Sequence, residues 1–251
     1  MKLAAVITVK DEADILAYTL AHFLAEGVDE ILVADDESTD STRDIIDTYA
    51  EHYPVLAVDL GPGYDQSVKM TRLAELAGDR GADWVICTDA DELWYDPDDR
   101  TLHDWFDKCG ADVVTAPMFT YEPHPDDDPD EPNPYRRMTH RASIREPMPK
   151  VAFRPAPGAV VALGNHFVTH PGTFVTGLEI GHYQWRSVAH MIHKARVGAA
   201  AADLAGIPSE HCVHWRALAA MTDGEIAVYF RSLADRPGLI DQPAPYKGDN
   251  L

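Results

Sequence analysis

The sequence lacks any apolar run long enough to cross a membrane. A transmembrane helix needs about 20 consecutive apolar residues, and the apolar runs here, such as LAAVITV at residues 3–9, are far shorter. That run follows directly on Met1-Lys2, so the charged leader and apolar core typical of a signal peptide do not precede it. We therefore expect a chain without a transmembrane segment and without a signal peptide.

Cysteine and positive charge are also scarce. The three cysteines, Cys87, Cys109 and Cys212, lie far apart and form no CxxC pair, which favours free thiols in a reducing compartment and makes the cytoplasm the expected location. The chain has 42 acidic and 21 basic residues, a net charge of −21. Binding to a nucleic-acid backbone needs a basic face, so we expect no nucleic-acid partner. A high-salt cytoplasm and a G+C-rich coding bias explain this composition equally well.

The sequence does contain a regular alternation of strand-like and helix-like segments. Apolar runs predict strands, and apolar residues at helical spacing predict helices, in the chain order 3–9, 15–26, 30–34, 43–51, 55–60, 67–76 and 84–88. Such alternation is typical of βαβ units around a mostly parallel sheet. A length of 251 residues suits one large domain of this kind.

Polar clusters follow three of the predicted strands, at residues 10–14, 35–42 and 89–92. In open α/β sheets, ligands bind beyond the carboxyl ends of the strands. We therefore expect the three clusters to meet at one edge of the sheet and to form the functional site.

Beyond residue 111 the pattern changes. A strand is predicted at 112–118, but residues 122–135 (EPHPDDDPDEPNPY) carry five prolines among many acids and cannot form a regular element, so we expect a mobile loop at 121–136. The later elements are expected as two short strands, a helix N-capped by Ser187, one or two further helices and a Pro-rich tail, at 151–168, 187–204, 209–234 and 236–251.

Asp89-Ala90-Asp91 is the pattern with the clearest chemistry. Residues two apart in an extended chain point the same way, and two carboxylates after the apolar strand WVICT suit Mg²⁺ or Mn²⁺, which also bind substrate phosphates. A metal held there can stabilise the charge of a departing nucleoside diphosphate. A helix cap or a solvated turn is the alternative that D-x-D alone would favour. The position of this pattern in the βαβ series favours the metal.

Asp35 and Asp36 end the second predicted strand. One of these carboxylates can accept a hydrogen bond from a nucleobase N–H or a ribose hydroxyl, as the acid after the second strand of dinucleotide-binding folds does. Capping of the next helix is the alternative role, which Ser38, Thr39 or Asp40 would serve equally well. We expect both roles on neighbouring residues.

Three segments taken together resemble glycosyltransferase family 2-like enzymes with the GT-A fold. VITVKDEADIL, EILVADDESTDST and ADWVICTDADEL look like successive motifs of that family, and HYQWRS…HKARVG, which begins at His182, is similar to a histidine-led motif in one subgroup. The resemblance implies an α/β fold, a GT-A-like Rossmann-type sandwich with a mostly parallel central sheet and additional C-terminal helices. It implies a single domain at 1–235, with a nucleotide-binding half at 1–120 and an acceptor-side half at 137–235.

The resemblance also implies roles for residues in the nucleotide-binding half. Val9 and the segment from Lys10 to Glu12 would line the nucleobase pocket, and Asp36 or Asp35 would contact the uracil or ribose. Asp89 and Asp91 would be the metal-binding pair, with Asp91 the more direct ligand of Mn²⁺ or Mg²⁺.

Further residues would complete the metal and phosphate sites. His182 would supply a third metal ligand, although a half-buried histidine is the plainer alternative. Lys194 would approach the diphosphate of the donor. Lys69, Arg72 and Arg196 are additional candidates for phosphate neutralisation, and solvated surface positions are their alternative.

The implied reaction is transfer of a sugar from a nucleotide-sugar donor, UDP-linked, to an acceptor hydroxyl, with inversion expected by analogy with family 2. Such a transfer needs a base within reach of the hydroxyl. The sequence departs from the family here, because no Glu-Asp pair stands in the usual place of the base; Asp11 also occupies a position where relatives often carry Asn. Glu122 is the first candidate base and His166 the second; the alternative for Glu122 is that it only begins the acidic loop, and for His166 an ordinary polar role.

Three alternative interpretations of the sequence belong to other classes of protein. HPDD at 124–127 resembles the zinc-binding motif of deacetylases of N-acetylglucosamine conjugates, and HCVH at 211–214 offers an HxxH partner. In that family HPDD follows the first strand, whereas here it stands in the acidic loop, which favours a chance match. A non-catalytic relative that binds a nucleotide sugar is the other alternative, because the base is missing. A sugar-1-phosphate nucleotidyltransferase is disfavoured, since VKDEAD contains no glycine.

Overall fold

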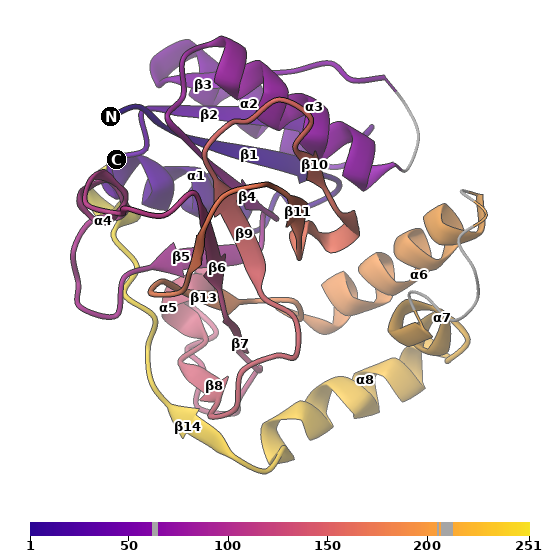
Figure 1. Ribbon diagram of the computed structural model, residues 1–251. Helices are drawn as coiled ribbons and strands as arrows, with labels where there is room; N and C mark the ends of the chain where they lie inside the picture. The colour runs from indigo at the N-terminus through magenta and orange to yellow at the C-terminus, as the bar shows by residue number, and fades with distance from the viewer. Residues whose placement is uncertain (62–64, 205, 207–212) are drawn as a thin grey trace.

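A seven-stranded sheet forms the centre of the computed structural model, which describes residues 1–61, 65–204, 206 and 213–251 (Figure 1). Its strands are β1 (Leu3–Val9), β2 (Glu30–Asp35), β3 (Val55–Ala57), β4 (Trp84–Thr88), β6 (Val113–Ala116), β9 (Lys150–Phe153) and β12 (Phe174–Val175). They lie in the order β12-β6-β9-β4-β1-β2-β3. Only β9 pairs antiparallel to its neighbours among the described strands of this sheet. The mostly parallel sheet predicted from the sequence is therefore confirmed.

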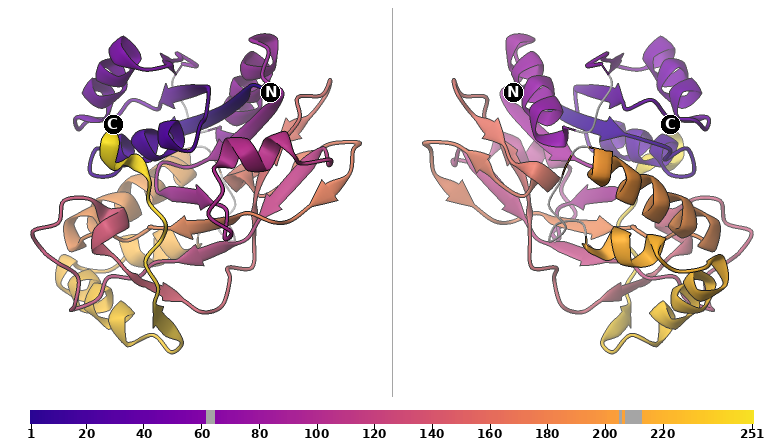
Figure 2. Two further views of the ribbon diagram at one scale, coloured as in Figure 1. Left: turned by 90° about the vertical axis from the view of Figure 1, so that its left-hand side faces the viewer. Right: turned by 90° about the vertical axis from the view of Figure 1, so that its right-hand side faces the viewer.

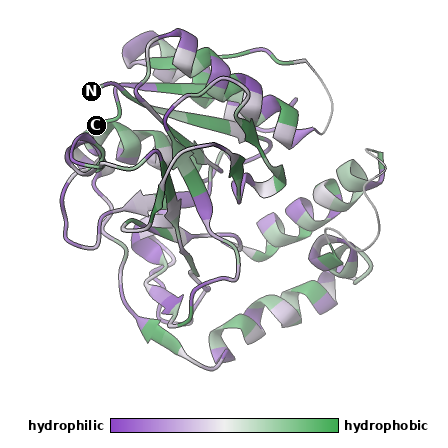
Figure 3. Ribbon diagram, in the orientation of Figure 1, coloured by the Kyte–Doolittle hydropathy of each residue, from purple (hydrophilic) through white to green (hydrophobic). Residues whose placement is uncertain are grey.

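Helices cover both faces of the sheet because the strands are apolar on both sides. Alternate residues of β1 point to opposite faces: Leu3 and Ile7 pack in the same core as α1 (Leu16–Ala25), α2 (Thr42–His52) and α4 (Leu102–Asp107). Val6 packs on the other face, against α3 (Gln66–Asp79) and the hairpin of β10 (Val160–Val161) and β11 (Val168–Thr169). The central strands are correspondingly the greenest elements of Figure 3.

A three-stranded sheet extends the molecule beyond the carboxyl end of β4. It has the order β5-β13-β7, formed by β5 (Glu92–Tyr95), β13 (Glu179–His182) and β7 (Met118–Thr120). His182 ends β13 and pairs with Glu92 at the start of β5. This register therefore brings the histidine-led motif beside the D-x-D segment, about 90 residues earlier in the chain.

The predicted acidic loop ends in a short helix. Residues 122–133 contain no helix or strand, as their prolines predict, but α5 (Pro134–Arg137) begins inside the expected loop, and the side chain of Asn133 caps it. Strand β8 (His140–Ala142) follows and pairs with β14 (Leu239–Asp241).

Three C-terminal helices pack on one another around a small apolar core of their own. They are α6 (Val188–Leu204), α7 (Val213–Ala219) and α8 (Asp223–Ser232), and Figures 1 and 2 show them side by side below α2 and α3. The hydroxyl of Ser187 accepts a hydrogen bond from His190 N–H (3.1 Å), which makes Ser187 the predicted cap of α6. None of the helices in the described part of the chain combines the length and the apolar composition that crossing a bilayer requires.

The segment expected as a Pro-rich tail packs onto α1 after leaving β14. The ring of Tyr246 stacks on His22, with ring centroids 5.8 Å apart. Lys247 N–H donates to His22 Nδ1 (3.2 Å), and its ammonium lies 3.1 Å from Oε1 of Glu26. Both His22 and Glu26 are fully buried. Residues 246–247 are therefore part of the packed domain.

Candidate active site

The loops that follow β1 and β2 are tied together at the sheet edge. Asp36 N–H donates to the carbonyl of Val9 (2.8 Å), and Asp11 N–H donates to Ser38 Oγ (2.9 Å). The Asp11 carboxylate accepts from Thr39 N–H (2.5 Å). Asp11 has a left-handed backbone with φ of 54°, a conformation that Asp and Asn tolerate better than other non-glycine residues. Asp can therefore stand where relatives often carry Asn.

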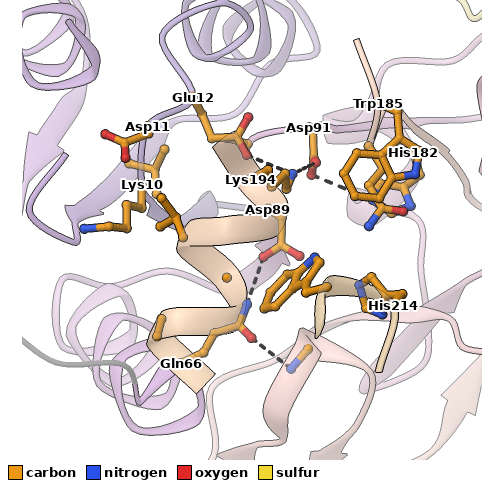
Figure 4. Close-up of a pocket in the computed structure, with 18 of the residues that line it drawn as sticks. Lys10, Asp11, Glu12, Gln66, Asp89, Asp91, His182, Trp185, Lys194 and His214 are labelled. Atoms are coloured by element: carbon orange, nitrogen blue, oxygen red, sulfur yellow. Dashed lines mark hydrogen bonds and ion pairs between the residues drawn. The ribbon is translucent and has the colours of Figure 1, made fainter. Parts of the chain in front are cut away.

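A cavity of about 1000 Å³ opens at this edge, lined by residues from the three strand-end clusters, from β13 and from the helices α6 and α7. Most residues predicted as site residues line it: Val9, Lys10, Glu12, Asp36, Lys69, Asp89, Asp91, His166, His182 and Lys194. Figure 4 labels six of these, Lys10, Glu12, Asp89, Asp91, His182 and Lys194. Two predicted site residues, Asp35 and Glu122, lie outside this lining. The predicted convergence of the three clusters on one edge is what the structure shows.

Asp89 is held in a buried network of charge and amide groups. Its Oδ2 accepts from the ammonium of Lys150 (2.6 Å), and its Oδ1 accepts from the amides of Gln66 and Asn165 (3.0 Å each). The same ammonium lies 2.7 Å from Oε1 of Glu92. Burial alone would lower the pKa of Lys150, but the two carboxylates raise it far above its ordinary value. Burial raises the pKa of Glu92 to about 7 despite Lys150.

Asp91 has different partners from Asp89. Its carboxylate pairs with the ammonium of Lys194, which also lies 2.9 Å from Oε1 of Glu12 (Figure 4). Burial would raise the pKa of Asp91, but the positive charge of Lys194 lowers it well below its ordinary value. Residues 90–91 form a turn between β4 and β5, so the predicted extended geometry of this segment is wrong, while both aspartates line the cavity.

His182 is oriented by a carboxylate on the side away from Asp91. Its Nδ1 lies 2.7 Å from Oε1 of Glu146, which also accepts from Thr120 Oγ1 (2.7 Å). Burial opposes both charges, yet their interaction lowers the pKa of Glu146 to about 2 and raises that of His182 to about 9. The other ring nitrogen, Nε2, lies 3.9 Å from Oδ1 of Asp91. A carboxylate that fixes one imidazole nitrogen is the usual support of a metal-binding histidine.

The donor set beside Asp91 fits a divalent cation. Ligand atoms of Asp91, Glu92 and His182 lie within 4.8 Å of one another, and carboxylates with an imidazole suit Mn²⁺ and related metals. Asp89 is not part of this group, and its oxygens accept from Lys150 and two amides. Asp89, Asp91 and His182 therefore stay predicted ligands, and Glu92, which the sequence did not single out, lies beside Asp91 and His182.

Positive charge gathers near the end of β2. The ammonium of Lys69 lies 2.6 Å from Oδ1 of Asp36, and that of Lys10 donates to the carbonyls of Asp36 (2.6 Å) and Glu37 (3.0 Å). Asp35 instead accepts hydrogen bonds from the N–H (3.1 Å) and hydroxyl (2.5 Å) of Ser38. Asp35 therefore stabilises the turn, and Asp36 faces the cavity.

Arg72 and Arg196, the two arginines that the sequence suggested for phosphate neutralisation, are surface residues. Arg72 pairs with Glu75 along α3, and Arg196 pairs with Asp223 at the start of α8. Neither arginine lines the cavity. These two positions are therefore solvated, which was the alternative in the sequence analysis.

Arg186 is a site residue whose role the sequence did not reveal. Its side chain is fully buried and pairs with Glu12 and with Asp14 (2.7 Å) in the loop after β1. It also donates to the carbonyl of Tyr183 (2.9 Å). Arg186 thus links the β1 loop to the segment that leads into α6. The only signal in the sequence was its place in the HYQWRS motif.

Helices α6 and α7 provide an apolar wall to the cavity. Its residues include Val197, Gly198, Ala201, Trp215 and Leu218. A Cβ on Gly198 would lie 2.6 Å from the indole of Trp215, so the absence of a side chain there allows the close contact of the two helices. The cavity therefore has a charged half near the sheet and an apolar half near the helices.

The two candidate bases differ in their access to the cavity. Glu122 is 1 % exposed and its carboxylate pairs with Arg236, while burial raises its pKa to about 7. His166 lines the cavity, and its Nδ1 lies 2.8 Å from the carbonyl of Pro149. A carbonyl only accepts, so Nδ1 carries the proton and Nε2 is an acceptor. Burial and Lys150 lower the pKa of His166, which keeps the ring neutral.

The zinc ligands of the deacetylase alternative do not come together as that alternative requires. His124 and Asp126 form a group of potential ligands with His140, whereas His214 lines the cavity. His211 lies outside the described residues. The deacetylase alternative therefore has no support in the described part of the chain.

Residues 4–162, well over half of the chain, match the sequence model of the family described as glycosyl transferase family 2. No curated protein sequence matches the chain. Many solved structures are similar to it, among them three at low identity. The mannosyltransferase PcManGT from Pyrobaculum calidifontis, in complex with GDP-Man and Mn²⁺, is 21 % identical, with a TM-score of 0.38 over 46 % of this chain and 35 % of that chain.

Residues 1–349 of S. aureus TarS, in complex with UDP, are 14 % identical, with a TM-score of 0.43 over 92 % of this chain and 70 % of that chain. Mannosyl-3-phosphoglycerate synthase from Rubrobacter xylanophilus is 21 % identical, with a TM-score of 0.36 over 52 % and 43 %. The chain thus matches between 35 % and 70 % of the length of these structures. Such distant likenesses carry no argument about activity, and the family match carries the assignment. The chain belongs to glycosyl transferase family 2, and the glycosyltransferase class and GT-A-type α/β fold expected from its motifs are confirmed.

Proposed function

We propose that the protein transfers a sugar from a nucleotide-sugar donor, UDP-linked, to an acceptor hydroxyl, with a divalent metal and with inversion. One observation carries the proposal: Asp91, His182 and Lys194 meet in a cavity that is also lined by Asp36, which follows β2, and by Lys69 of α3. Carboxylates for a metal and ammonium groups for phosphates are what a nucleoside diphosphate needs.

The nucleoside half of the donor is assigned to the loops after β1 and β2. Val9 and Lys10 line this part of the cavity. Asp36, held by Lys69, presents the carboxylate for a uracil N–H or a ribose hydroxyl. Lys10 and Lys194 supply positive charge for the phosphates of the donor. In the structure, the ammonium of Lys194 pairs with the carboxylates of Asp91 and Glu12.

Asp91 and His182 would hold the metal, with Glu92 as a neighbouring donor. When bound, Mn²⁺ or Mg²⁺ would offset the negative charge of the diphosphate that leaves. Glu146 would keep Nε2 of His182 turned toward Asp91 through its bond to Nδ1. Lys150 would keep Asp89 in place beside them.

His166 is the base that we assign to the acceptor hydroxyl. Its Nε2 is an unprotonated acceptor at neutral pH, because Nδ1 binds the carbonyl of Pro149 and the pKa of the ring is lowered. Glu122 is instead a positioning residue, since its pairing holds Arg236 at the cavity lining.

Free thiols at Cys87 and Cys109 support a reducing compartment such as the cytoplasm.

Calorimetric titration with UDP and with GDP, each with and without Mn²⁺, tests the donor site. We expect UDP binding that requires Mn²⁺ and that weakens at least tenfold in Asp91→Asn. The matched control is Asp79→Asn, at the exposed end of α3, which should bind as the native protein does. Equal Mn²⁺-dependent binding by Asp91→Asn would refute the metal assignment. A preference for GDP over UDP would refute uracil as the nucleobase of the donor.

Turnover of a UDP-sugar in single-turnover experiments tests the base. We expect His166→Gln to bind the donor normally and to lose about 10²–10⁴-fold in rate, the usual contribution of a general base. His52→Gln, at the exposed end of α2, should retain the native rate. Full activity of His166→Gln would exclude His166 as the base, and donor binding without turnover in the native protein would favour the non-catalytic relative.

A further inference from the structure

The HPDD segment has a structural partner outside the candidate active site. The imidazole of His124 stacks on that of His140 in β8, with ring centroids 3.7 Å apart and ring planes 17° from parallel. The carboxylate of Asp126 lies 3.4 Å from Nδ1 of His124. One ligand atom from each of these three residues lies within 4.8 Å of the other two. Two segments of the chain therefore bring two imidazoles and a carboxylate together, and the stacked rings must turn for a nitrogen of each to face one ion.

Backbone hydrogen bonds hold the two segments together. Glu122 N–H donates to the carbonyl of His140 (2.9 Å), and His124 N–H donates to Oδ2 of Asp127 (2.9 Å). The other oxygen of Asp127, Oδ1, is buried and has no hydrogen-bond partner among the described residues. An acceptor without a donor is costly in a buried place, and it is the kind of group that a nearby cation stabilises.

The local charge favours a cation. Asp126, Asp127, Asp128, Asp130 and Glu131 are all acidic and lie within six consecutive residues. Arg137 interacts electrostatically with Asp127. The guanidinium of Arg137 also donates to the carbonyls of Glu131 (3.0 Å) and Arg186 (3.3 Å). Acidic residues therefore dominate the stretch of loop that follows His124.

We propose that His124, Asp126 and His140 bind a zinc ion at a site separate from the catalytic cavity. Two histidines and one carboxylate are a common zinc ligand set, and water takes the fourth position. Tetrahedral bonds of about 2.0–2.1 Å place ligand atoms roughly 3.4 Å apart, so the side chains must approach by about 1 Å. The carboxylate of Asp126 is 78 % exposed and is free to make that movement.

The ion would fasten the acidic loop to the frame of the active site. His140 belongs to β8, which pairs with β14. Arg236, just before β14, lines the cavity and pairs with Glu122 at the start of the acidic loop. Zinc bound between loop and strand would thus stiffen the support of Arg236 without touching the substrates. The ion would link loop and strand; a water in the open fourth position is compatible with that role, and neither HxxH nor hydrolysis is needed for it.

Zinc titration of the full chain by calorimetry tests the proposal. Asp91→Asn is used as the background so that the ligand set around Asp91 is weakened. We expect one Zn²⁺ per chain with micromolar affinity, a tenfold or greater loss in His124→Ala and in His140→Ala, and an unchanged affinity in the control His52→Ala. Asp126→Asn, at an exposed side chain whose loss leaves the fold intact, should also weaken binding. Zn²⁺ should raise the melting temperature of the background protein but not that of His124→Ala.

Three results would overturn the proposal. The first is no zinc binding by the folded background protein at 100 µM Zn²⁺. The second is undiminished binding in His124→Ala and His140→Ala. The third is binding that disappears in His214→Ala while His124→Ala retains it, which would place the zinc at the HxxH segment.

Discussion

Lys150 is the residue whose replacement tests most directly how charge is arranged under the active site. Its ammonium lies between the carboxylates of Asp89 (2.6 Å) and Glu92 (2.7 Å), and Lys150 itself is 3 % exposed. Lys150→Met keeps the length and apolar stem of the side chain and removes only the charge. Breaking a buried ion pair by removing one partner costs about 3–5 kcal/mol. We expect about 3 kcal/mol at pH 7, the lower end, because Asp89 is partly exposed to water.

The pH dependence of this loss has a definite sign. Burial already raises the pKa of Glu92 to about 7 with Lys150 present, and without the ammonium the pKa rises further. A carboxyl group with a raised pKa in the folded state favours folding below its unfolded pKa of about 4.3 and loses that advantage as the pH rises. The penalty of Lys150→Met should therefore be smaller at pH 5 than at pH 7.

Urea unfolding at both pH values measures the effect. Lys150→Met/Glu92→Gln should recover about half of the loss or more, because the Gln oxygen can still accept from Asp89 N–H (3.1 Å) and from Thr88 Oγ1 (3.2 Å). Arg43→Met is the matched control, since the Arg43 ion pair with Asp47 is at the surface and contributes about 0–1 kcal/mol. A loss below about 1 kcal/mol in Lys150→Met, equal to that of the control, would refute the reasoning.

Three other predictions concern elements around the site. Burial lowers the pKa of His22 to about 4, so below pH 6.5 the unfolded chain binds a proton that the folded protein does not. The free energy of unfolding, measured with urea, should therefore fall by about 3 kcal/mol between pH 7 and 4. The fall should be smaller in His22→Gln. Gly198→Ala should displace Trp215, whose indole would lie 2.6 Å from the new Cβ, and cost about 1–3 kcal/mol, with a shift in tryptophan fluorescence; an unchanged spectrum would contradict the packing. Thr222→Ala removes the capping box with Glu225 and should cost about 1 kcal/mol in thermal unfolding.

The parts of the site on β1, β2 and β4 were predictable because they depend on local patterns. An apolar run followed by polar residues marks the end of a strand, and parallel strands bring their ends to one edge. Lys10, Asp36 and Asp91 were found in this way. The turn at residues 90–91 was not, because nothing in the sequence distinguishes a continuing strand from a turn after WVICT, and it determines that Asp89 and Asp91 have different partners.

Residues contributed by later segments could not be located from the sequence. Lys150 reaches Asp89 only because β9 pairs antiparallel with β4, and a single antiparallel strand in a parallel sheet leaves no periodic signal. Glu146 stands in an irregular segment and Asn165 ends the short 3-10 helix Leu163–Asn165, where side-chain direction depends on the surrounding fold. For Glu122 the acidic side chain suggested a catalytic base. Its burial and its ion pair with Arg236 depend on the tertiary structure, so the sequence did not reveal them.

The contact between α1 and residues 246–247 has a consequence for how the protein is made. Helix α1 leaves the ribosome early, but the N–H that donates to Nδ1 of His22 comes from Lys247, 225 residues later. At about 5–20 residues per second, roughly 10–45 s of translation separate the two. During that interval His22 and Glu26 lack their final cover, so a nascent chain stalled before Tyr246 should remain open to proteases and chaperones at α1. The domain reaches its finished state only when its last segment has been synthesised.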